Sequence, residues 1–206
     1  MSNILRARAP AYPLIVHNPF MSVWSITDEL TQSWPVHWSG TNQTMCGMVR
    51  IDGKPYRFMG MVSRMGTDVP AMAQTRREVT PTRTTYGFEV AGIAIEVGFL
   101  SPLLPDDLEL MARPLSYISI SARATDDKKH DVRVYLDWSA NWVAEAETEI
   151  VWGRHRAGDV EALFMGAAQQ KPLGRSGDEV QIDWGYLYVS PEPGVPATGA
   201  FGDALS

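Results

Sequence analysis

Apolar and polar residues alternate along most of this chain, and this two-residue period constrains the fold more than any other feature of the sequence. Successive side chains of an extended strand point to opposite faces, so alternation gives each strand one apolar face. The pattern predicts strands at 47–51, 54–59, 84–90, 93–99, 116–124, 132–138, 149–156, 161–167 and 180–189. Helical spacing is nearly absent, and we expect a turn or two of helix only over 141–149.

Turn residues join these strands into hairpins. Asp52-Gly53 separates two alternating segments and favours the two-residue turn that connects adjacent antiparallel strands. Ala91-Gly92 and the charged segment 125–130 separate two further pairs. Strands with one apolar face need a second layer to cover that face, so we predict an all-β fold, a β-sandwich of antiparallel strands.

The chain divides into two parts on this interpretation. Residues 1–75 form an N-terminal segment with an aromatic loop and the Asp-Gly hairpin, and residues 76–206 form the larger sandwich portion. We expect both to belong to one sandwich. The final residues, 190–206, contain three prolines and no closing strand, so we expect the sandwich to be incomplete at its C-terminus.

Composition argues against several kinds of partner and site. A formal charge of -6 and no clustered Lys and Arg argue against nucleic-acid binding, and a small neutral or zwitterionic ligand fits better. No apolar segment is long enough to span a membrane, and no export signal is visible at the N-terminus. A single cysteine, Cys46, excludes an internal disulfide and a cysteine-based zinc site.

Catalytic motifs are not found. The sequence contains no nucleophile elbow, Walker loop, dinucleotide fingerprint, zinc-protease motif or EF-hand loop, so we predict neither a metal nor a cofactor. We interpret Cys46 as a buried structural residue, and Asp106, Asp107 and Glu109 as a solvated turn rather than a cation site. Asp137 lies in a strand, where an outward structural role is expected before a catalytic one.

Trp34, His37 and Trp38 are the candidate binding residues. They occur in the sequence SWPVHWSG, in which Pro35 and Gly40 indicate a loop, and binding residues concentrate in loops. Two indoles and an imidazole can line a pocket for a small polar ligand. They can equally seal the edge of the sandwich or form a docking surface for another domain. His17, His130 and His155 are far apart in sequence, and we interpret them as surface or hydrogen-bonded histidines.

A family resemblance rests on several motifs in fixed order. The segments PAYPLIVHNPFMSVWS, LTQSWPVHWSG, VRIDGKPYRFMG, SPLLPDDLELMARPLSYISI, HDVRVYLDWSAN and QIDWGYLYV resemble the N-terminal region of the glutaminase A family, from about residue 8 to residue 189. The resemblance implies an N-terminal β-sandwich followed by a C-terminal α/α toroid of six helical hairpins, in enzymes that hydrolyse L-glutamine to L-glutamate and ammonia. It also implies secreted or periplasmic members, although the localisation of this chain stays open.

The resemblance assigns no catalytic residue to a position in this chain. We therefore expect the chain to be the non-catalytic N-terminal part of a glutaminase A-like amidohydrolase and inactive alone. Its expected partners are the C-terminal toroid of the same full-length protein and a small-molecule substrate. Trp34, His37 and Trp38 would contact one or the other. Two alternatives remain: the sandwich of a carbohydrate-active enzyme with an α/α toroid, because fold does not determine substrate, or a free-standing binding module.

Overall fold

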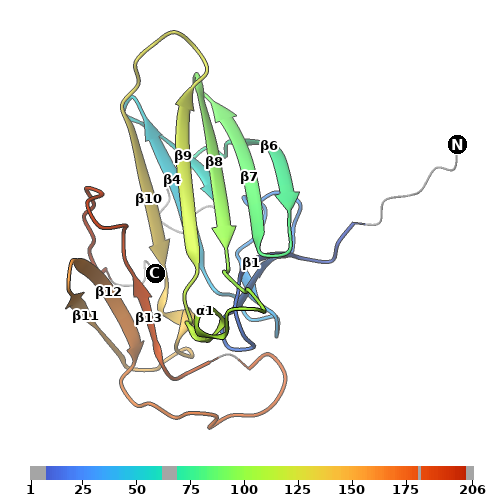
Figure 1. Ribbon diagram of the computed structural model, residues 1–206, viewed down its shortest axis with the longest axis vertical. Coiled ribbons are helices and arrows are strands. Elements are labelled where there is room, and N and C mark those ends of the chain that lie inside the picture. The colour runs from blue at the N-terminus through green and yellow to red at the C-terminus, as the bar shows by residue number, and fades with distance from the viewer. Residues whose placement is uncertain (1–7, 62–68, 181, 203–206) are drawn as a thin grey trace, which may run out of the picture.

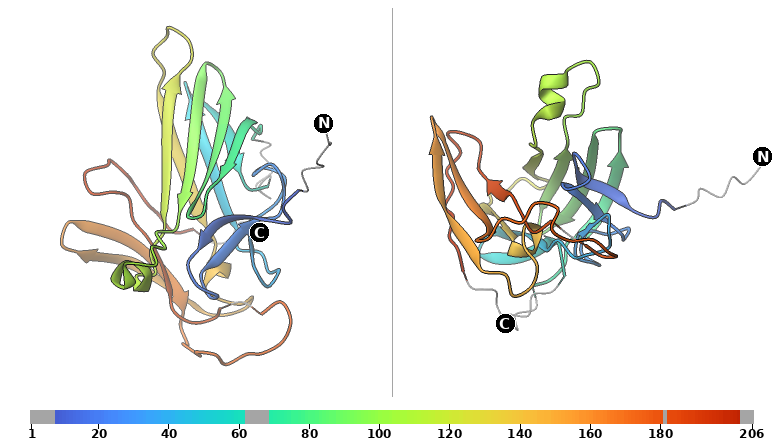
Figure 2. Two further views of the ribbon diagram at one scale, coloured as in Figure 1. Left: turned by 45° about the vertical axis from the view of Figure 1, so that its right-hand side comes forward. Right: turned by 90° about the horizontal axis from the view of Figure 1, so that it is seen from below.

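The computed structural model describes residues 8–61, 69–180 and 182–202, which form an all-β structure of four antiparallel sheets (Figure 1). Two of these sheets face each other and form the sandwich, as Figure 2 shows from two further directions. One has the strand order β6-β7-β8-β9, and the other has the order β10-β4-β5. The strands of the sandwich are β4 (Met45–Ile51), β5 (Lys54–Met59), β6 (Ala73–Val79), β7 (Arg83–Val90), β8 (Ile93–Leu100), β9 (Tyr117–Ala124) and β10 (Val132–Trp138). The predicted β-sandwich is confirmed.

The hydrophobic core lies between these two sheets. Alternate residues of β8 point inward and are at most 2% exposed: Ile93, Ile95, Val97 and Phe99. From the two facing sheets, Phe58 of β5 and Phe88 of β7 bring their ring centroids within 5.9 Å of each other. Burying an aromatic side chain of this kind stabilises the folded state by about 1.5–3 kcal/mol, so the alternation in the sequence supplies the packing between the layers.

The two-residue turns have the backbone conformation that their residues predict. Asp52 and Gly53 have φ angles of 50° and 85°, and Ala91 and Gly92 have φ angles of 50° and 77°. Positive φ at both central positions twists the turn in the sense that antiparallel strands require. The hairpins β4–β5 and β7–β8 predicted from sequence are therefore confirmed.

Two smaller sheets lie at the end of the sandwich away from the 125–131 loop (Figures 1 and 2). One has the order β1-β2-β3 and the other the order β11-β12-β13. The backbone N–H of Val16, at the end of β1, donates to the Ser101 hydroxyl at 3.1 Å and so ties the first small sheet to the segment after β8. The strands of the two smaller sheets are β1 (Tyr12–Val16), β2 (Ser22–Ser25), β3 (Val36–His37), β11 (Ile150–Ala157), β12 (Val160–Ala167) and β13 (Tyr186–Val189).

One predicted pairing is wrong. Residues 116–124 and 132–138 do not form a hairpin, because β9 pairs with β8, whereas β10 pairs with β4 in the facing sheet. The charged segment between them crosses from one sheet to the other.

The remaining differences concern short elements. The expected helix over 141–149 is reduced to a single 3-10 turn, η1 (Ala140–Trp142), and one short helix, α1 (Leu108–Ala112), was not expected. Strand β13 is shorter than the predicted 180–189, and β1, β2, β3 and β6 were not predicted. All four take part in pairings that have a register shift or only two paired positions, where alternation is weak. No helix among the described residues has the length and apolar character needed to cross a lipid bilayer.

Candidate functional site

His37 lies in the short strand β3 and is buried, with 4% of its surface exposed. Its Nε2 lies 2.9 Å from the carbonyl oxygen of Pro19. A carbonyl can only accept, so Nε2 carries the hydrogen and Nδ1 is the acceptor. Nδ1 lies 2.8 Å from the Ser39 hydroxyl and 3.3 Å from the Ser39 backbone nitrogen, which donates to it.

Burial lowers the pKa of His37 below its usual value, although its hydrogen bond to the Pro19 carbonyl acts in the opposite direction. The ring is therefore neutral at neutral pH. Both of its nitrogens already have partners in the fold, so His37 holds the loop to the turn after β1 and is a poor candidate for moving a proton.

Trp38 is anchored at one edge and open on its face. Its indole N–H donates to the same Pro19 carbonyl oxygen at 2.7 Å, while 63% of the residue remains exposed. The ring centroids of His37 and Trp38 are 5.7 Å apart. With its only polar group already bonded, Trp38 can offer a ligand or a partner only the surface of its ring.

Trp34 lies apart from this pair. Its half-buried ring packs against Gly60, where an added β-carbon would come within 2.7 Å of the ring. Trp34 lines neither of the two cavities described next. Of the three residues singled out in the sequence, the structure thus brings only His37 and Trp38 to one place.

His37 and Trp38 form one wall of a cavity of about 250 Å³, called here the aromatic cavity. The opposite wall comes from residues 173–177, 180 and 182–184, which lie far away in sequence. The two walls are also joined by Phe20 and Trp184, whose rings meet edge to face with centroids 5.1 Å apart. The lining is mostly aromatic and aliphatic, which suits an apolar group or a complementary protein surface.

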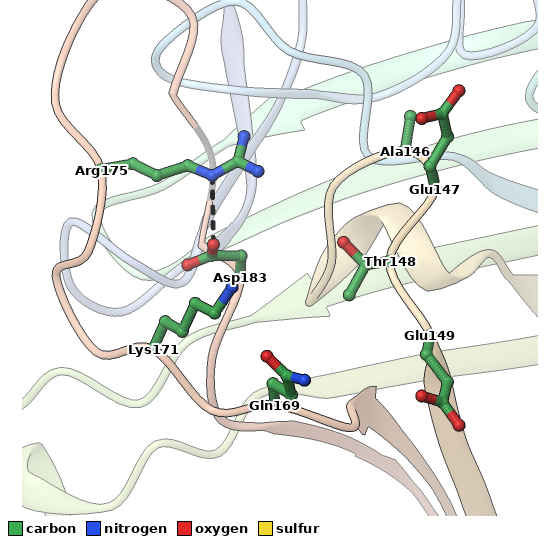
Figure 3. A pocket seen from close by; sticks show the side chains of 8 residues that line it. All are labelled: Ala146, Glu147, Thr148, Glu149, Gln169, Lys171, Arg175 and Asp183. Atoms are coloured by element: carbon green, nitrogen blue, oxygen red, sulfur yellow. Dashed lines mark ion pairs between the residues drawn. The ribbon is translucent and has the colours of Figure 1, made fainter.

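A second cavity has a volume of about 300 Å³, and Figure 3 shows the side chains that line it; it is called here the charged cavity. Arg175 and Asp183 line both cavities. The remaining lining residues of the charged cavity are Ala146, Glu147, Thr148, Glu149, Gln169 and Lys171. Sequence analysis identified none of these residues, because they come from loops whose charged residues have no characteristic spacing.

Cys46 is buried, as predicted, and burial raises the pKa of its thiol to about 12. The thiol therefore stays protonated near neutral pH and is a poor nucleophile. The neighbouring Asp137 is half-buried and accepts a hydrogen bond from the Cys46 backbone N–H at 3.2 Å. Burial also raises the pKa of Asp137, while its hydrogen bonds to Tyr135 and Cys46 lower it.

The acidic side chains of Asp107 and Glu109, at the start of α1, have structural roles. The Asp107 carboxylate accepts a hydrogen bond from the Leu110 backbone N–H at 2.8 Å and so caps the helix. Glu109 forms an ion pair with Arg113 one helical turn later. Within residues 8–61, 69–180 and 182–202, no group of three or more His, Cys, Asp or Glu side chains is arranged to hold a metal ion.

Comparison with known proteins identifies the family. A family model described as Domain of unknown function (DUF5127) matches residues 82–204, more than half of the chain. The chain belongs to the DUF5127 family. A second model, described as Domain of unknown function (DUF4964), matches residues 2–66. No solved structure matches the chain significantly.

This member of the DUF5127 family is similar to two curated fungal proteins. Glutaminase A of Aspergillus oryzae is 30% identical over 213 residues, which cover 95% of this chain and 30% of that protein. A protein of Arthroderma benhamiae named "Probable glutaminase" is 25% identical over 203 residues, which cover 89% of this chain and 23% of that protein. The predicted resemblance to the N-terminal region of the glutaminase A family is confirmed. The chain spans less than a third of the length of either relative.

Proposed function

We propose that this chain is the N-terminal, non-catalytic β-sandwich part of a glutaminase A-like amidohydrolase, which in its full-length form converts L-glutamine to L-glutamate and ammonia. The observation that carries the proposal is the similarity to glutaminase A along 95% of the chain. We further propose that the rest of the full-length protein, an α/α toroid by family resemblance, supplies the catalytic groups.

The chemistry of the described residues supports a binding role. Hydrolysis of a carboxamide needs a nucleophile or an activated water, a proton donor for the leaving ammonia and stabilisation of an oxyanion. At the aromatic cavity, both nitrogens of His37 are already hydrogen-bonded within the fold. Cys46 is buried and protonated, and it lines neither cavity. These groups are suited to building a surface and not to breaking a bond.

Trp38 is the residue through which we propose that the sandwich acts. Its side chain is exposed, donates to the Pro19 carbonyl, and lines the aromatic cavity. Aromatic side chains fixed in this way are common at the centres of interfaces and in small-molecule sites. We propose that it contacts the helical domain or the substrate at the entrance of the active site.

The test uses the full-length protein and compares Trp38→Ala with Trp152→Ala. Trp152 is 60% exposed on β11 and stacks on Phe201, so its replacement removes an equally exposed indole elsewhere. We expect kcat/KM for release of ammonia from glutamine to fall about tenfold in Trp38→Ala, equivalent to about 1.4 kcal/mol. The Trp152→Ala protein should retain the wild-type value.

The chain alone should release no ammonia from glutamine. Turnover by the purified 206-residue chain would contradict the non-catalytic role, and equal kcat/KM in the two tryptophan variants would remove Trp38 from the proposal.

A second candidate function is that of a carbohydrate-active enzyme. The observation that favours it is the open face of Trp38, because an indole whose N–H is already bonded can still stack on a flat apolar surface such as the face of a sugar ring. Activity of the full-length protein on a glycan, without activity on glutamine, would select this candidate over the glutaminase.

A further inference from the structure

The two sheets of the sandwich end along the same side of the molecule (Figures 1 and 2). β9 is the outermost strand of one sheet, and β10 is the outermost strand of the facing sheet. In the described parts of the chain, β9 pairs only with β8 and β10 pairs only with β4. Each of the two strands therefore has one edge whose backbone N–H and C=O groups face no other strand.

Apolar side chains of the core reach the surface between these two strands. Residues that pair across two strands share a face of the sheet. Val134 pairs with Val49, which is fully buried between the sheets, yet Val134 is 46% exposed. On β9, Ala122 is exposed although its partner Ile95 is buried, and Ile120 on the same face is only half-buried. The strip formed by Ile120, Ala122 and Val134 is called here the open flank.

The opposite side of the sandwich is closed by other parts of the chain. The segment 70–72 runs beside β5, where its backbone exchanges hydrogen bonds of 2.9 and 2.8 Å with the backbone of Arg57. Beside β6, the side chains of Gln74 and Arg77 each donate to the Asp28 carbonyl oxygen at 2.8 Å. No comparable cover lies over the open flank among the residues that the structure describes.

The edge of β9 also lacks the features that keep edge strands from pairing. Such strands are usually protected by charged side chains, prolines or bulges. β6 has this protection, because it carries Arg76, Arg77 and Glu78 and has a register shift against β7. β9 has a single charged residue, Arg123, and no proline, and it pairs with β8 over eight positions without a shift. It therefore offers a long, regular edge to which another strand can add.

We infer that the free edge of β9 takes an additional β-strand from the part of the full-length protein outside these 206 residues, and that the side chains of this strand cover the open flank. The inference rests on the proposed function, which treats this chain as one part of a longer enzyme. The chain spans only 30% of the length of glutaminase A, so the larger part of such a protein is available to supply the strand.

Two contributions favour this pairing. Backbone hydrogen bonds to β9 hold the added strand, and its inward side chains remove the exposed apolar groups of both sheets from water. A strand on the same polypeptide is present at a high effective concentration, which favours it over the same strand edge of a second copy.

The experiment compares cysteine labelling in the 206-residue chain and in the full-length protein. Val134→Cys places a thiol in the open flank. Val79→Cys is the matched control, because Val79 is 47% exposed on β6, at the opposite side of the sandwich. A maleimide should label both variants in the 206-residue chain. In the full-length protein, Val134→Cys should react at least about tenfold more slowly, because a covered thiol reacts only when the strand opens. Val79→Cys should react at an unchanged rate.

Hydrogen exchange tests the backbone pairing itself. In an antiparallel sheet, alternate N–H groups of an edge strand point away from its one partner. Peptides from β9 should therefore take up deuterium more slowly in the full-length protein than in the 206-residue chain, whereas peptides from β6 should exchange alike in both. Protection of Val134→Cys without slower exchange of β9 would mean that side chains alone cover the flank, and would overturn the added strand.

The remaining outcomes are equally decisive. Equal labelling of Val134→Cys in the two proteins, or equal slowing of Val134→Cys and Val79→Cys, would overturn the inference. Protection of Val134→Cys in a 206-residue chain that sediments as a dimer would also overturn it, because a second copy would then occupy the edge. Ammonia release by the full-length protein is measured separately. Release with an unprotected flank would retain the proposed function and remove the strand, and a protected flank without release would do the reverse.

Discussion

Gly47 lies in β4 directly under the ring of Phe58, at the point where the register between β4 and β5 shifts. A β-carbon at this position would come within 2.3 Å of a ring atom, so any side chain must displace a fully buried phenylalanine. We expect Gly47→Ala to lower the free energy of unfolding by about 1–3 kcal/mol, as overpacking of a core does. Urea unfolding measures this change. Gly202→Ala, where nothing lies within 4 Å, is the control, and equal stability of the two variants would contradict the prediction.

We expect His37 and His130 to differ in protonation state, because their pKa values are shifted in opposite directions. Burial lowers the pKa of His37, whereas hydrogen bonds to Asp126 and Asp52 raise the pKa of His130. At pH 6.5 we therefore expect His37 to be neutral with its hydrogen on Nε2 and His130 to be charged. Nitrogen-15 NMR of the imidazole rings distinguishes these states, and titration of both rings at the same pH would show that one assignment is wrong.

At the scale of elements, His130 joins two loops at the far end of the sandwich. Its Nδ1 lies 2.6 Å from Asp52 in the β4–β5 turn, and its Nε2 lies 2.9 Å from Asp126 in the β9–β10 loop. The Asp52 carboxylate also accepts the backbone N–H of Asp131 at 2.9 Å. The two facing sheets are thus linked at this end through one imidazole.

This link should depend on pH in a defined direction. The raised pKa of His130 contributes stability that is complete below its unfolded pKa of 6.5 and is lost as pH rises through the folded pKa. The lowered pKa values of Asp52 and Asp126, caused first by their hydrogen bonds to His130, contribute stability that is lost as pH falls below 3.8. We therefore expect the link to be strongest between these limits.

Hydrogen exchange, corrected for intrinsic rates, measures the effect. Amides in 125–131 should be better protected at pH 5.5 than at pH 8, and His130→Gln should remove that difference. His155→Gln, on β11, is the control and should behave like the wild type. The same difference persisting in His130→Gln would exclude the imidazole as its source.

Strands could be predicted from the sequence where the alternation of apolar and polar residues continued over many residues and a short turn joined neighbouring strands. The β7–β8 hairpin needs only its alternation and Ala91-Gly92, all within one stretch of sequence. The candidate sites were less predictable. His37 and Trp38 were found together because they are adjacent in sequence, although His37 lies in β3 and not in the predicted loop. The cavity wall that faces them comes from residues 173–177, 180 and 182–184. A contact between loops so far apart is set by the whole fold and leaves no periodic signal.

At the scale of the whole molecule, the sandwich combines both family-model segments. Strand β4 belongs to the segment 2–66, which one family model matches, and β10 belongs to the segment 82–204, which the other matches. The two strands pair along the full length of β4, from Met45 to Ile51. Phe58 and Phe88 likewise bring one segment each into the shared core. Neither segment therefore buries its apolar strand faces alone.

A fragment of residues 69–206 should accordingly lack a cooperative unfolding transition. It loses β4, β5 and the buried side chains Val49 and Phe58, and removing a single buried phenylalanine side chain already costs about 3–5 kcal/mol. Circular dichroism during heating measures the transition, with the 206-residue chain as the reference. A sharp transition in the fragment would mean that it is an independent folding unit.

The Pro19 carbonyl accepts hydrogen bonds from both His37 and Trp38. This acceptor belongs to the main chain, so it persists whichever amino acid occupies position 19, while both donors depend on the identity of their side chains. A substitution at position 19 therefore leaves the acceptor in place, whereas a substitution at 37 or 38 removes a donor. Natural variants that keep the loop in place should tolerate substitution at 19 as long as the backbone path is retained, and should rarely change 37 or 38 alone.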